Sequence, residues 1–507
     1  MKKFYSLAAL LLMVWTGVQA YSFKSNELCY DITSTNPATV TVTFERATDV
    51  SSSKASYLNL GGGVVIPETV YNGGKAYTVT GIGDFAFFRC DLITSVSIPK
   101  TVETIGIYAF YAAKITSATF GSSSVLTEIG QQAFDCTPIT SVEIPNTVTT
   151  LGGYAFSRTA LVTANIPTSI QNLGNGVFSG CNSLNNVSIP NGLKEISPYT
   201  FQSCYSLTKV TLPSTLTTIG KYAFKGAGLT SISLPSGLTS IGEYAFKDAP
   251  LTSLTIPAAV TSIGEYAFSE TALTTVTIPS TVTSIGNYAF ASIATLKSAK
   301  IFNSKISRRE FEKCINLKEV TIGSGVESIE KDPSNPIWPF YGCTSLETVS
   351  ISSNAALNCN EYLSHNMATV KTVTIENGVT AIPENAFLDF AAIETMTIPS
   401  TITSIGNAAF KGCTAMRDFF SKMTRPITID ASVFEGVQQH GYCDLHVPQG
   451  SVGRYQAMEV WKEFYVIDDA AGPGGDSGSG VRGDLNGDKK VDVEDVNAVI
   501  NIILDLE

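Results

Sequence analysis

A short fragment, Ile-Gly-x-x-Ala-Phe, recurs along most of this 507-residue chain. Close copies end at Phe87, Phe110, Phe134, Phe224, Phe246, Phe268, Phe290 and Phe410, and looser copies end at Phe156, Phe178, Phe201 and Phe387. From Phe87 to Phe290 the copies are 22 to 24 residues apart. A repeat of this length can bury its apolar side chains only against the repeats on either side of it. The sequence therefore predicts a solenoid of stacked coils rather than several globular domains.

A second fragment precedes each copy and predicts the local structure of the repeat. In Val276-Thr277-Ile278-Pro279 and its equivalents, aliphatic and hydroxyl side chains alternate with a period of two. This alternation predicts a short strand with aliphatic side chains inward and Thr or Ser side chains outward. Pro ends the strand because it cannot donate a ladder hydrogen bond, and Gly after the second Ile allows a tight turn. The Phe is expected to fill the interior of the coil.

The compound unit formed by these two fragments resembles the BspA-like leucine-rich repeats of secreted and surface proteins in oral and gut anaerobic bacteria. The resemblance covers residues 79–437 and implies a β-rich, right-handed array of coils. It also implies an N-terminal cap over residues 21–78 and a C-terminal cap over residues 438–470. The repeat is irregular over residues 291–374, where one coil lacks a Phe.

Residues 1–20 have the features of a secretory signal peptide. Lys2 and Lys3 precede a short apolar stretch, and Ala20 ends a small-x-small cleavage pattern. The alternative is an N-terminal membrane anchor, for which the apolar stretch is shorter than the roughly 20 residues that a span needs. No other stretch predicts a transmembrane span. We therefore expect a secreted, extracellular or cell-surface protein.

Charge and motif content exclude several classes of function. The formal net charge is -11, and Lys and Arg form no basic run, which argues against a nucleic-acid partner. None of the three histidines, His365, His440 and His446, forms a metal-binding or triad signature with nearby residues. The chain has no Gly-x-Ser-x-Gly, phosphate-binding or His-Glu-x-x-His motif. We therefore predict that the chain is not an enzyme.

Most of the cysteines share one repeat position. Those that lie three residues after the conserved Phe, or its equivalent, are Cys90, Cys181, Cys204, Cys314, Cys343 and Cys413. Metal binding and disulfides are one interpretation of this column, and a stack of buried free thiols is the other. The second is favoured because Cβ bonds that point in parallel suit disulfide geometry poorly. The pairing of Cys29, Cys136, Cys359 and Cys443 cannot be read from the sequence.

Two outward columns are candidates for a binding surface. The outward strand positions are rich in hydroxyl groups and comprise Thr208, Lys209, Thr211, Thr230, Ser231, Ser233, Thr252, Ser253, Thr255, Thr274, Thr275 and Thr277. The second column lies two residues before the Phe and includes Tyr222, Tyr244, Tyr266 and Tyr288. Both columns are also explained by simple repetition of residues that suit an exposed β surface. As a binding surface, the tyrosines would supply contact area and a polar tip.

The C-terminal segment has the pattern of a calcium loop. After a Gly- and Ser-rich linker at residues 471–482, residues 483–507 contain Asp484, Asn486, Asp488, Asp492 and Asp495 at positions 1, 3, 5, 9 and 12 of a loop. The Lys490 carbonyl would occupy position 7, so the predicted cofactor is Ca²⁺. An apolar face formed by Val496, Val499, Ile500 and Ile503 then predicts a helix.

This segment resembles one EF-hand-like calcium-binding repeat of a dockerin, the module that binds cohesins in polysaccharide-degrading assemblies. It departs from that pattern at Lys489, where Gly is usual, and in offering one repeat where dockerins carry two. With no partner repeat to cover it, the apolar face of the predicted helix must pack on the solenoid, pair with a second chain or dock on a cohesin-like receptor. Two functions remain open: an adhesin-like protein that binds a protein or glycan on a host or bacterial surface, and an accessory subunit of a polysaccharide-degrading assembly.

Overall fold

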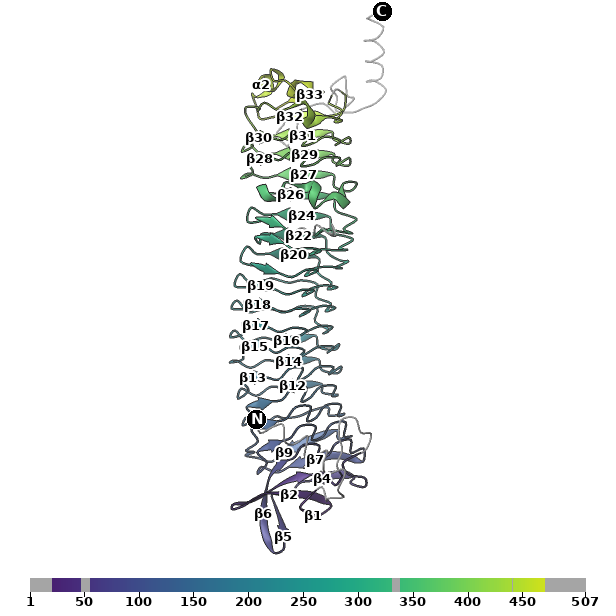
Figure 1. Ribbon diagram of the computed structural model, residues 1–507, viewed down its shortest axis with the longest axis vertical. Coiled ribbons are helices and arrows are strands. Elements are labelled where there is room, and N and C mark those ends of the chain that lie inside the picture. The colour runs from purple at the N-terminus through teal and green to yellow at the C-terminus, as the bar shows by residue number, and fades with distance from the viewer. Residues whose placement is uncertain (1–20, 47–54, 331–337, 440, 470–507) are drawn as a thin grey trace, which may run out of the picture. The chain divides into compact units, whose positions relative to one another are not determined.

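The computed structural model describes residues 21–46, 55–330, 338–439 and 441–469. These residues form two compact units: the first comprises the chain up to residue 317 with residues 328–344, and the second comprises residues 318–327 and the chain from residue 345 onward. Within each unit the coils stack in sequence order, as the repeat predicts (Figure 1). The predicted signal peptide, linker and calcium loop lie outside the described residues.

Each coil of the first unit can form strands at two positions. The Val-x-Ile fragments form the first strand column, which comprises β4 (Gly62–Val65), β7 (Ile93–Ile98), β9 (Ser117–Phe120), β12 (Thr163–Asn165), β14 (Asn186–Ser188), β16 (Lys209–Thr211), β20 (Thr275–Ile278) and β22 (Ser298–Ile301). Paired neighbours in this column run parallel, and the equivalent residues Val187 and Val210 of β14 and β16 lie opposite each other. Equivalent side chains of successive coils therefore stack directly on one another.

The Ile of the Ile-Gly fragment forms a second strand column of very short strands. These are β8 (Thr104–Ile105), β10 (Glu128–Ile129), β11 (Thr150–Leu151), β13 (Asn172–Leu173), β15 (Glu195–Ile196), β17 (Thr218–Ile219), β18 (Ser240–Ile241), β19 (Ser262–Ile263), β21 (Ser284–Ile285), β23 (Lys305–Ile306) and β25 (Ser328–Ile329). The pairs are again parallel, with Ile219 opposite Ile241 and Ile241 opposite Ile263. The sequence pattern did not predict this second column.

The N-terminal end of the first unit is a set of hairpins rather than a repeat. It contains β1 (Phe23–Ser25), β2 (Leu28–Thr35), β3 (Ala38–Thr43), β5 (Thr69–Asn72) and β6 (Lys75–Ile82). The pairs β1–β2, β2–β3 and β5–β6 are antiparallel, whereas β3 pairs with β6 in parallel. Because β6 also pairs with β8, this sheet continues into the second strand column and covers its first coil.

A wide turn between the two strand columns carries the conserved Phe. Main-chain bonds join successive turns, such as Phe224 N–H to the Ala245 carbonyl at 2.8 Å. The Phe rings are buried and stack in one continuous series with centroid separations of 5.0–6.1 Å, which runs through Phe87, Phe110, Phe134, Phe156, Phe178, Phe201, Phe224, Phe246, Phe268, Phe290, Phe311 and Phe340. The prediction that Phe fills the coil interior is confirmed.

The glycine of the Ile-Gly fragment is required for a different reason from the one that the sequence indicated. Its φ angle is not positive in the regular coils, so it does not serve a left-handed turn. Instead, a Cβ atom at Gly264 would lie 2.4 Å from the Glu243 nitrogen, and one at Gly242 would lie 2.7 Å from the Lys221 nitrogen. In these coils glycine is needed because the main chains of successive coils approach too closely for a side chain, whereas the coils of Phe201 and Phe311 carry Ser197 and Ser307 at this position.

The second unit repeats the same arrangement over fewer coils. Its main strand column comprises β24 (Glu319–Ile322), β26 (Thr348–Ile351), β27 (Thr372–Ile375), β29 (Thr395–Ile398), β31 (Asp418–Ser421), β32 (Asp444–His446) and β33 (Val466–Asp468), with β28 (Ala381–Ile382) and β30 (Ser404–Ile405) in the shorter one. Phe387, Phe410 and Phe434 stack in this unit. The coil that lacks a Phe instead folds into three 3-10 turns, η1 (Asn354–Ala356), η2 (Cys359–Glu361) and η3 (Ser364–Asn366).

The C-terminal end of the second unit departs from the repeat. A 3-10 turn, η4 (Ala431–Phe434), precedes β32, and the helix α2 (Val452–Gln456) and the turn η5 (Trp461–Glu463) precede β33. Tyr455, Trp461 and Phe464 of this segment are buried, and the Trp461 ring meets the rings of Phe419 and Phe434 edge to face. These aromatic side chains therefore cover the apolar end of the second unit.

All ten cysteines are free thiols, which agrees with the interpretation as buried packing residues. Five of the column members donate S–H to the Phe carbonyl of the preceding coil, as Cys204 does to Phe178 at 3.2 Å, whereas Cys90 of the first coil donates to the Phe88 carbonyl. A Thr at the same position donates to its own Phe carbonyl, as Thr271 does to Phe268 at 2.8 Å. Burial raises the pKa of the Cys314 thiol to about 12. These thiols are therefore neutral side chains that pack and satisfy carbonyl groups.

Candidate functional site

The outward positions of the first strand column face solvent as predicted. All of the candidates from Thr208 to Thr277 are exposed, whereas Leu207, Leu229, Leu251 and Leu273, which begin the same segments, are completely buried. The alternation of Thr and Ser with aliphatic residues produces this division, because successive side chains of an extended chain point to opposite sides. The result is a neutral face rich in hydroxyl groups, on which Lys209 is the charged member.

This face is not the continuous sheet that the repeat predicts. Strands form at β16 and β20, but residues 230–234 and 252–256 between them form none. The coils there remain joined by the second strand column and by single bonds such as Thr252 N–H to the Thr230 carbonyl at 3.0 Å. These links hold the coils together at other points, and no strand ladder forms here in the first strand column. Leu212, Ile232 and Leu254 are therefore only half-buried. The prediction of a strand in these two coils is therefore wrong.

Where the strand ladder of the first column is interrupted, the surface is hollowed into grooves. One groove of about 380 Å³ is lined by Val210, Thr211, Leu212, Ser214, Ser233, Pro235 and Ser236, so it contains two of the predicted surface residues. A larger groove of about 870 Å³ lies at the same position of earlier coils, between residues 117–124 and 141–147. The strand ladder there is reduced to the isolated bridges Ser117–Ser141 and Glu143–Asn165. The repeat alone did not indicate either groove.

The tyrosine column forms a stacked ladder along the aromatic turn. Tyr222, Tyr244, Tyr266 and Tyr288, with Tyr199 before them, are half-buried, and their ring centroids lie 4.5–5.1 Å apart. The φ angles of the four predicted residues are 53–61°, so the turn holds each tyrosine in a left-handed conformation. The rings cover one another, so a ligand would meet their edges and hydroxyl groups rather than their faces. Burial and the neighbouring tyrosines raise the pKa of Tyr266 to about 12.

Charged side chains border the tyrosine ladder. Lys221 pairs with Glu243 of the next coil, and Lys247 pairs with both Asp248 and Glu270. The Arg309 guanidinium lies 5.4 Å from the centroid of Tyr288, so it closes the ladder at that end. The acids and bases of these pairs offset one another, so the paired side chains add little net charge to this border.

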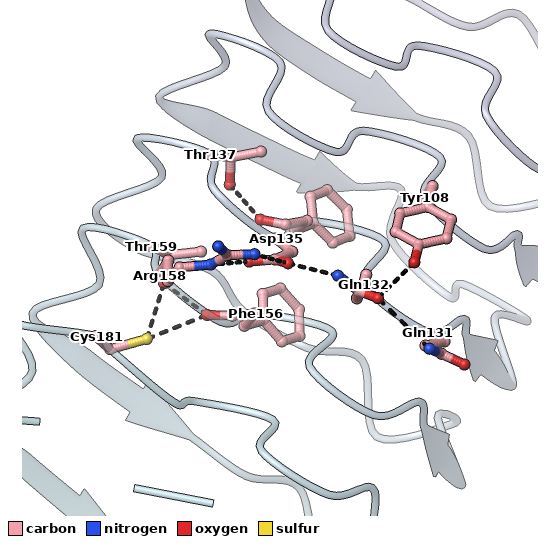
Figure 2. Close-up of polar contacts among 10 residues, drawn as sticks. Tyr108, Gln131, Gln132, Asp135, Thr137, Phe156, Arg158, Thr159 and Cys181 are labelled. Carbon is pink, nitrogen blue, oxygen red and sulfur yellow. Dashed lines mark hydrogen bonds and ion pairs between the residues drawn. The ribbon is translucent and has the colours of Figure 1, made fainter. Parts of the chain in front are cut away.

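A buried carboxylate lies on the same turns in earlier coils (Figure 2). The Asp135 side chain is inaccessible to solvent and accepts from Arg158 Nε at 3.0 Å and Nη2 at 2.6 Å. Gln132 donates to it at 2.8 Å and accepts from the Tyr108 hydroxyl at 2.7 Å. The carboxylate is therefore saturated by three donors and joins neighbouring coils, which is the geometry of a structural ion pair rather than of a general base.

In the second unit a histidine joins three strands. His446 Nδ1 lies 2.7 Å from an Asp468 carboxylate oxygen, and Nε2 lies 3.2 Å from one of Asp418. Burial disfavours the charged imidazole, but the hydrogen bonds to the two carboxylates outweigh burial and raise the pKa of His446. Since a raised pKa favours the folded state while the imidazole is protonated, this contact stabilises the unit at acidic pH and weakens as pH rises through that pKa.

Metal binding is predicted on a part of the chain that the structure does not describe. Asp484, Asn486, Asp488, Lys490, Asp492 and Asp495 all lie outside the described residues, so the Ca²⁺ loop stays a prediction. Within the residues that are described, no group of three or more His, Cys, Asp or Glu side chains is arranged to hold a metal ion. Across the same residues, no helix has both the length and the apolar character of a membrane span.

One solved structure provides independent evidence for the fold, and a second is reported for its similarity alone. A leucine-rich repeat protein from Bacteroides ovatus is similar over 79% of this chain and 94% of its own, with 23% identity and a TM-score of 0.51. A leucine-rich cell surface protein from Faecalibacterium prausnitzii covers 80% of this chain and 96% of its own, with 24% identity and a TM-score of 0.39. No curated protein matches the chain.

The sequence pattern of the repeat family gives the stronger result. The pattern described as the BspA type leucine-rich repeat region (6 copies) matches residues 75–185, 171–297, 217–335 and 304–440. These overlapping matches span the predicted repeats and far more than half of the chain, and they include both candidate columns. The chain belongs to the BspA-type leucine-rich repeat family.

Proposed function

We propose that this chain is a non-catalytic binding protein, secreted or held at the cell surface, that presents its first strand column to a protein or glycan ligand. The observation that carries the proposal is the row of exposed hydroxyl groups from Thr208 to Thr277. Among the described residues, Thr252 is the one member of that row whose hydroxyl group forms a hydrogen bond within the chain, which it donates to the Thr230 carbonyl at 3.3 Å. The other hydroxyl groups are therefore available to a ligand.

The location in this proposal depends on the N-terminal sequence and on the family. Residues 1–20 have the order of positive, apolar and small residues that directs export. Membership in the BspA-type family agrees with export, since the repeats it resembles occur in secreted and surface proteins. Fractionation of cells that express the full chain tests the location, and recovery of the protein with residues 1–20 intact in the cytoplasm would contradict it.

A binding array of host glycans and matrix proteins tests the function. The mature chain is compared with Ser231→Arg and Thr275→Arg, which place a large charged side chain on the first strand column. Ser284→Arg, an exposed residue of β21 in the second column, is the matched control. We expect a ligand that the native chain and the control retain and that both column variants lose. Equal binding by all four proteins would show that the ligand lies elsewhere.

We further propose that residues 483–507 bind one Ca²⁺ ion. The support is the loop sequence, in which Asp484, Asn486, Asp488, Asp492 and Asp495 supply side-chain oxygens and Lys490 a carbonyl. A bound ion would relieve the repulsion between these carboxylates and order the helix that follows. That helix would then offer its apolar face to a cohesin-like receptor or to a second chain, which is the basis of the alternative function in a polysaccharide-degrading assembly.

Calorimetric titration of the full chain with calcium tests this second proposal. We expect one binding event that disappears in the double variant Asp484→Ala, Asp495→Ala. If the chain binds no calcium at millimolar concentration, the proposal is wrong and residues 483–507 are only an acidic tail. A pull-down with purified cohesins, with and without calcium, then separates the assembly role from the adhesin-like role.

A further inference from the structure

The larger groove on the first strand column differs in chemistry from the rest of that column. Its floor is apolar and includes the half-buried Phe120 ring, and its rim carries hydroxyl, amide and carboxylate groups. Glu143, Asn146 and Asn165 are exposed on this rim, and within the described residues their side chains form no hydrogen bond or ion pair. A volume of about 870 Å³ is within the range of roughly 300–1,000 Å³ that is usual for small-molecule sites.

The groove arises from a local change in the repeat. Phe120-Gly121 occupies the place of the Ile-Pro pair that Ile98 and Ile144 begin in the coils on either side. The loop that follows is two residues longer, since eight residues lie between Phe120 and Ile129 and six lie between Ile98 and Ile105. Phe is larger than the Ile it replaces, and its ring stays partly exposed where Ile98 is 1% exposed. The longer loop and the larger side chain together account for the groove at this coil.

The polar groups of the groove restrict the chemistry of its ligand. The lining contains one carboxylate, Glu143, and no Lys or Arg side chain. A site without a cation does not favour phosphate, sulfate or a carboxylated sugar, because nothing offsets the cost of removing the anion from water. A single acid beside amides and hydroxyls can instead accept from and donate to neutral hydroxyl groups.

We propose that this groove binds a short segment of an uncharged oligosaccharide. The Phe120 ring would pack against the apolar face of one sugar ring, while Glu143 accepts from its hydroxyl groups and Asn146 and Asn165 bond to neighbouring ones. An extended peptide, which would pair with the edge of β9 beyond the bridge Ser117–Ser141, is the alternative occupant, and the test below separates it from a saccharide. This inference rests on the proposed binding function and names the ligand class for one site.

Calorimetric titration of the full mature chain tests the proposal with uncharged gluco-, galacto-, manno- and xylo-oligosaccharides. Phe120→Ile removes the ring and introduces the residue that the neighbouring coils carry, so the fold is retained. Glu143→Gln removes the charge and keeps the shape. We expect Glu143→Gln to weaken binding about tenfold or more, as loss of a hydrogen bond to a charged group does. Phe120→Ile should also weaken binding, because it removes the ring that packs against the sugar. Glu128→Gln, an exposed acid on β10, is the matched control and should bind like the native chain.

Two outcomes would overturn the assignment while leaving the proposed function intact. One is an uncharged oligosaccharide that binds the native chain and both groove variants equally well. The other is binding only of a sulfated or carboxylated glycan, or of a protein, with no uncharged saccharide bound. A chain that binds no glycan and no protein at all would contradict the proposed function as well as the groove.

Discussion

The coil that carries Phe246 and the coil that carries Phe311 occupy the same stack of rings but surround the ring with different residues. Phe246 follows Gly242, Tyr244 and Ala245, which are the usual residues of the repeat. Phe311 follows Ser307, Arg309 and Glu310 at the same positions. The stack nevertheless continues, since the Phe311 ring lies 5.6 Å from that of Phe290 and the two planes differ by 12°.

The difference shows that the position in the coil decides the environment, whatever residue occupies it. Ala245 and Glu310 are both completely buried. Glu310 Oε2 accepts from the Ser307 N–H at 2.8 Å, but Oε1 has no hydrogen-bond partner among the described residues. Burial raises the pKa of Glu310 to about 8. A polar residue directly before the Phe, where the regular coils carry Ala, therefore loses its hydration, because the parallel main-chain bonds and the Phe stack fix the register of the coil.

The largest effect is expected at the Phe stack itself. Phe246→Ala should lower the free energy of unfolding by about 3–5 kcal/mol, because it leaves a cavity between two stacked rings. Phe311→Ala should lower the free energy of unfolding by a similar amount, because its ring is likewise stacked between two others. Urea denaturation of both variants measures this comparison. A loss confined to Phe246→Ala would show that the irregular coil contributes little to the stack.

A smaller and opposite effect is expected at Glu310. Glu310→Ala introduces the residue of the regular coils and should stabilise the protein by roughly 3 kcal/mol at neutral pH, since the native carboxyl must stay protonated or ionise without hydration. A raised carboxyl pKa means that the folded state binds more protons, so the native chain loses stability as pH rises from about 4.5 to about 8.

Thermal unfolding of the native chain and of Glu310→Ala between these pH values measures the difference. The stabilisation should shrink towards acidic pH, where the native carboxyl is protonated in both states. Glu312→Ala, two residues later, is the control for loss of a nearby acid. A stabilisation by Glu310→Ala that does not change with pH would contradict the role of ionisation.

Replacement of a ladder tyrosine should cost much less than replacement of the Phe two residues later. Tyr244→Ala removes stacking with Tyr222 and Tyr266 from a half-buried site, so we expect a loss of about 0.5–1.5 kcal/mol. The comparison with Phe246→Ala under the same denaturant conditions tests the facing of the turn. Equal losses for the two variants would mean that the tyrosine is as much a core residue as the Phe.

The smallest effect is expected where the ladder ends. Arg309 and Tyr288 both adopt a positive φ, at 55° and 61°, so Tyr can replace Arg there without new backbone strain. Arg309→Tyr extends the ladder but removes the contact with Tyr288 and the pair with Glu312 at 3.1 Å. The gain from the longer ladder and the loss of these two contacts should nearly cancel, so the unfolding free energy should change by less than about 0.5 kcal/mol. A large loss would show that the guanidinium is needed to close the ladder.

The sequence by itself determined the features that depend on the repeat. The recurrence of Phe at a near-constant spacing is sufficient to predict the solenoid, and the alternation in Val-x-Ile is sufficient to predict which residues face solvent. The cysteine column was also predictable as packing, because Ala, Thr and Cys replace one another at its position. These predictions succeed because a parallel stack gives every copy of a position the same neighbours.

The tertiary structure alone decided the features that depend on how two particular coils meet. The repeat predicts a strand at residues 230–234 and 252–256, but the coils there are joined at other points and neither segment forms a strand. The need for glycine at Gly264 comes from the approach of the next main chain, which no spacing within one repeat reveals. The groove beside Phe120 and the ion pair of Asp135 with Arg158 likewise join residues of different coils. A periodic sequence specifies the average contact between coils, whereas each groove and each buried charge is a departure from that average.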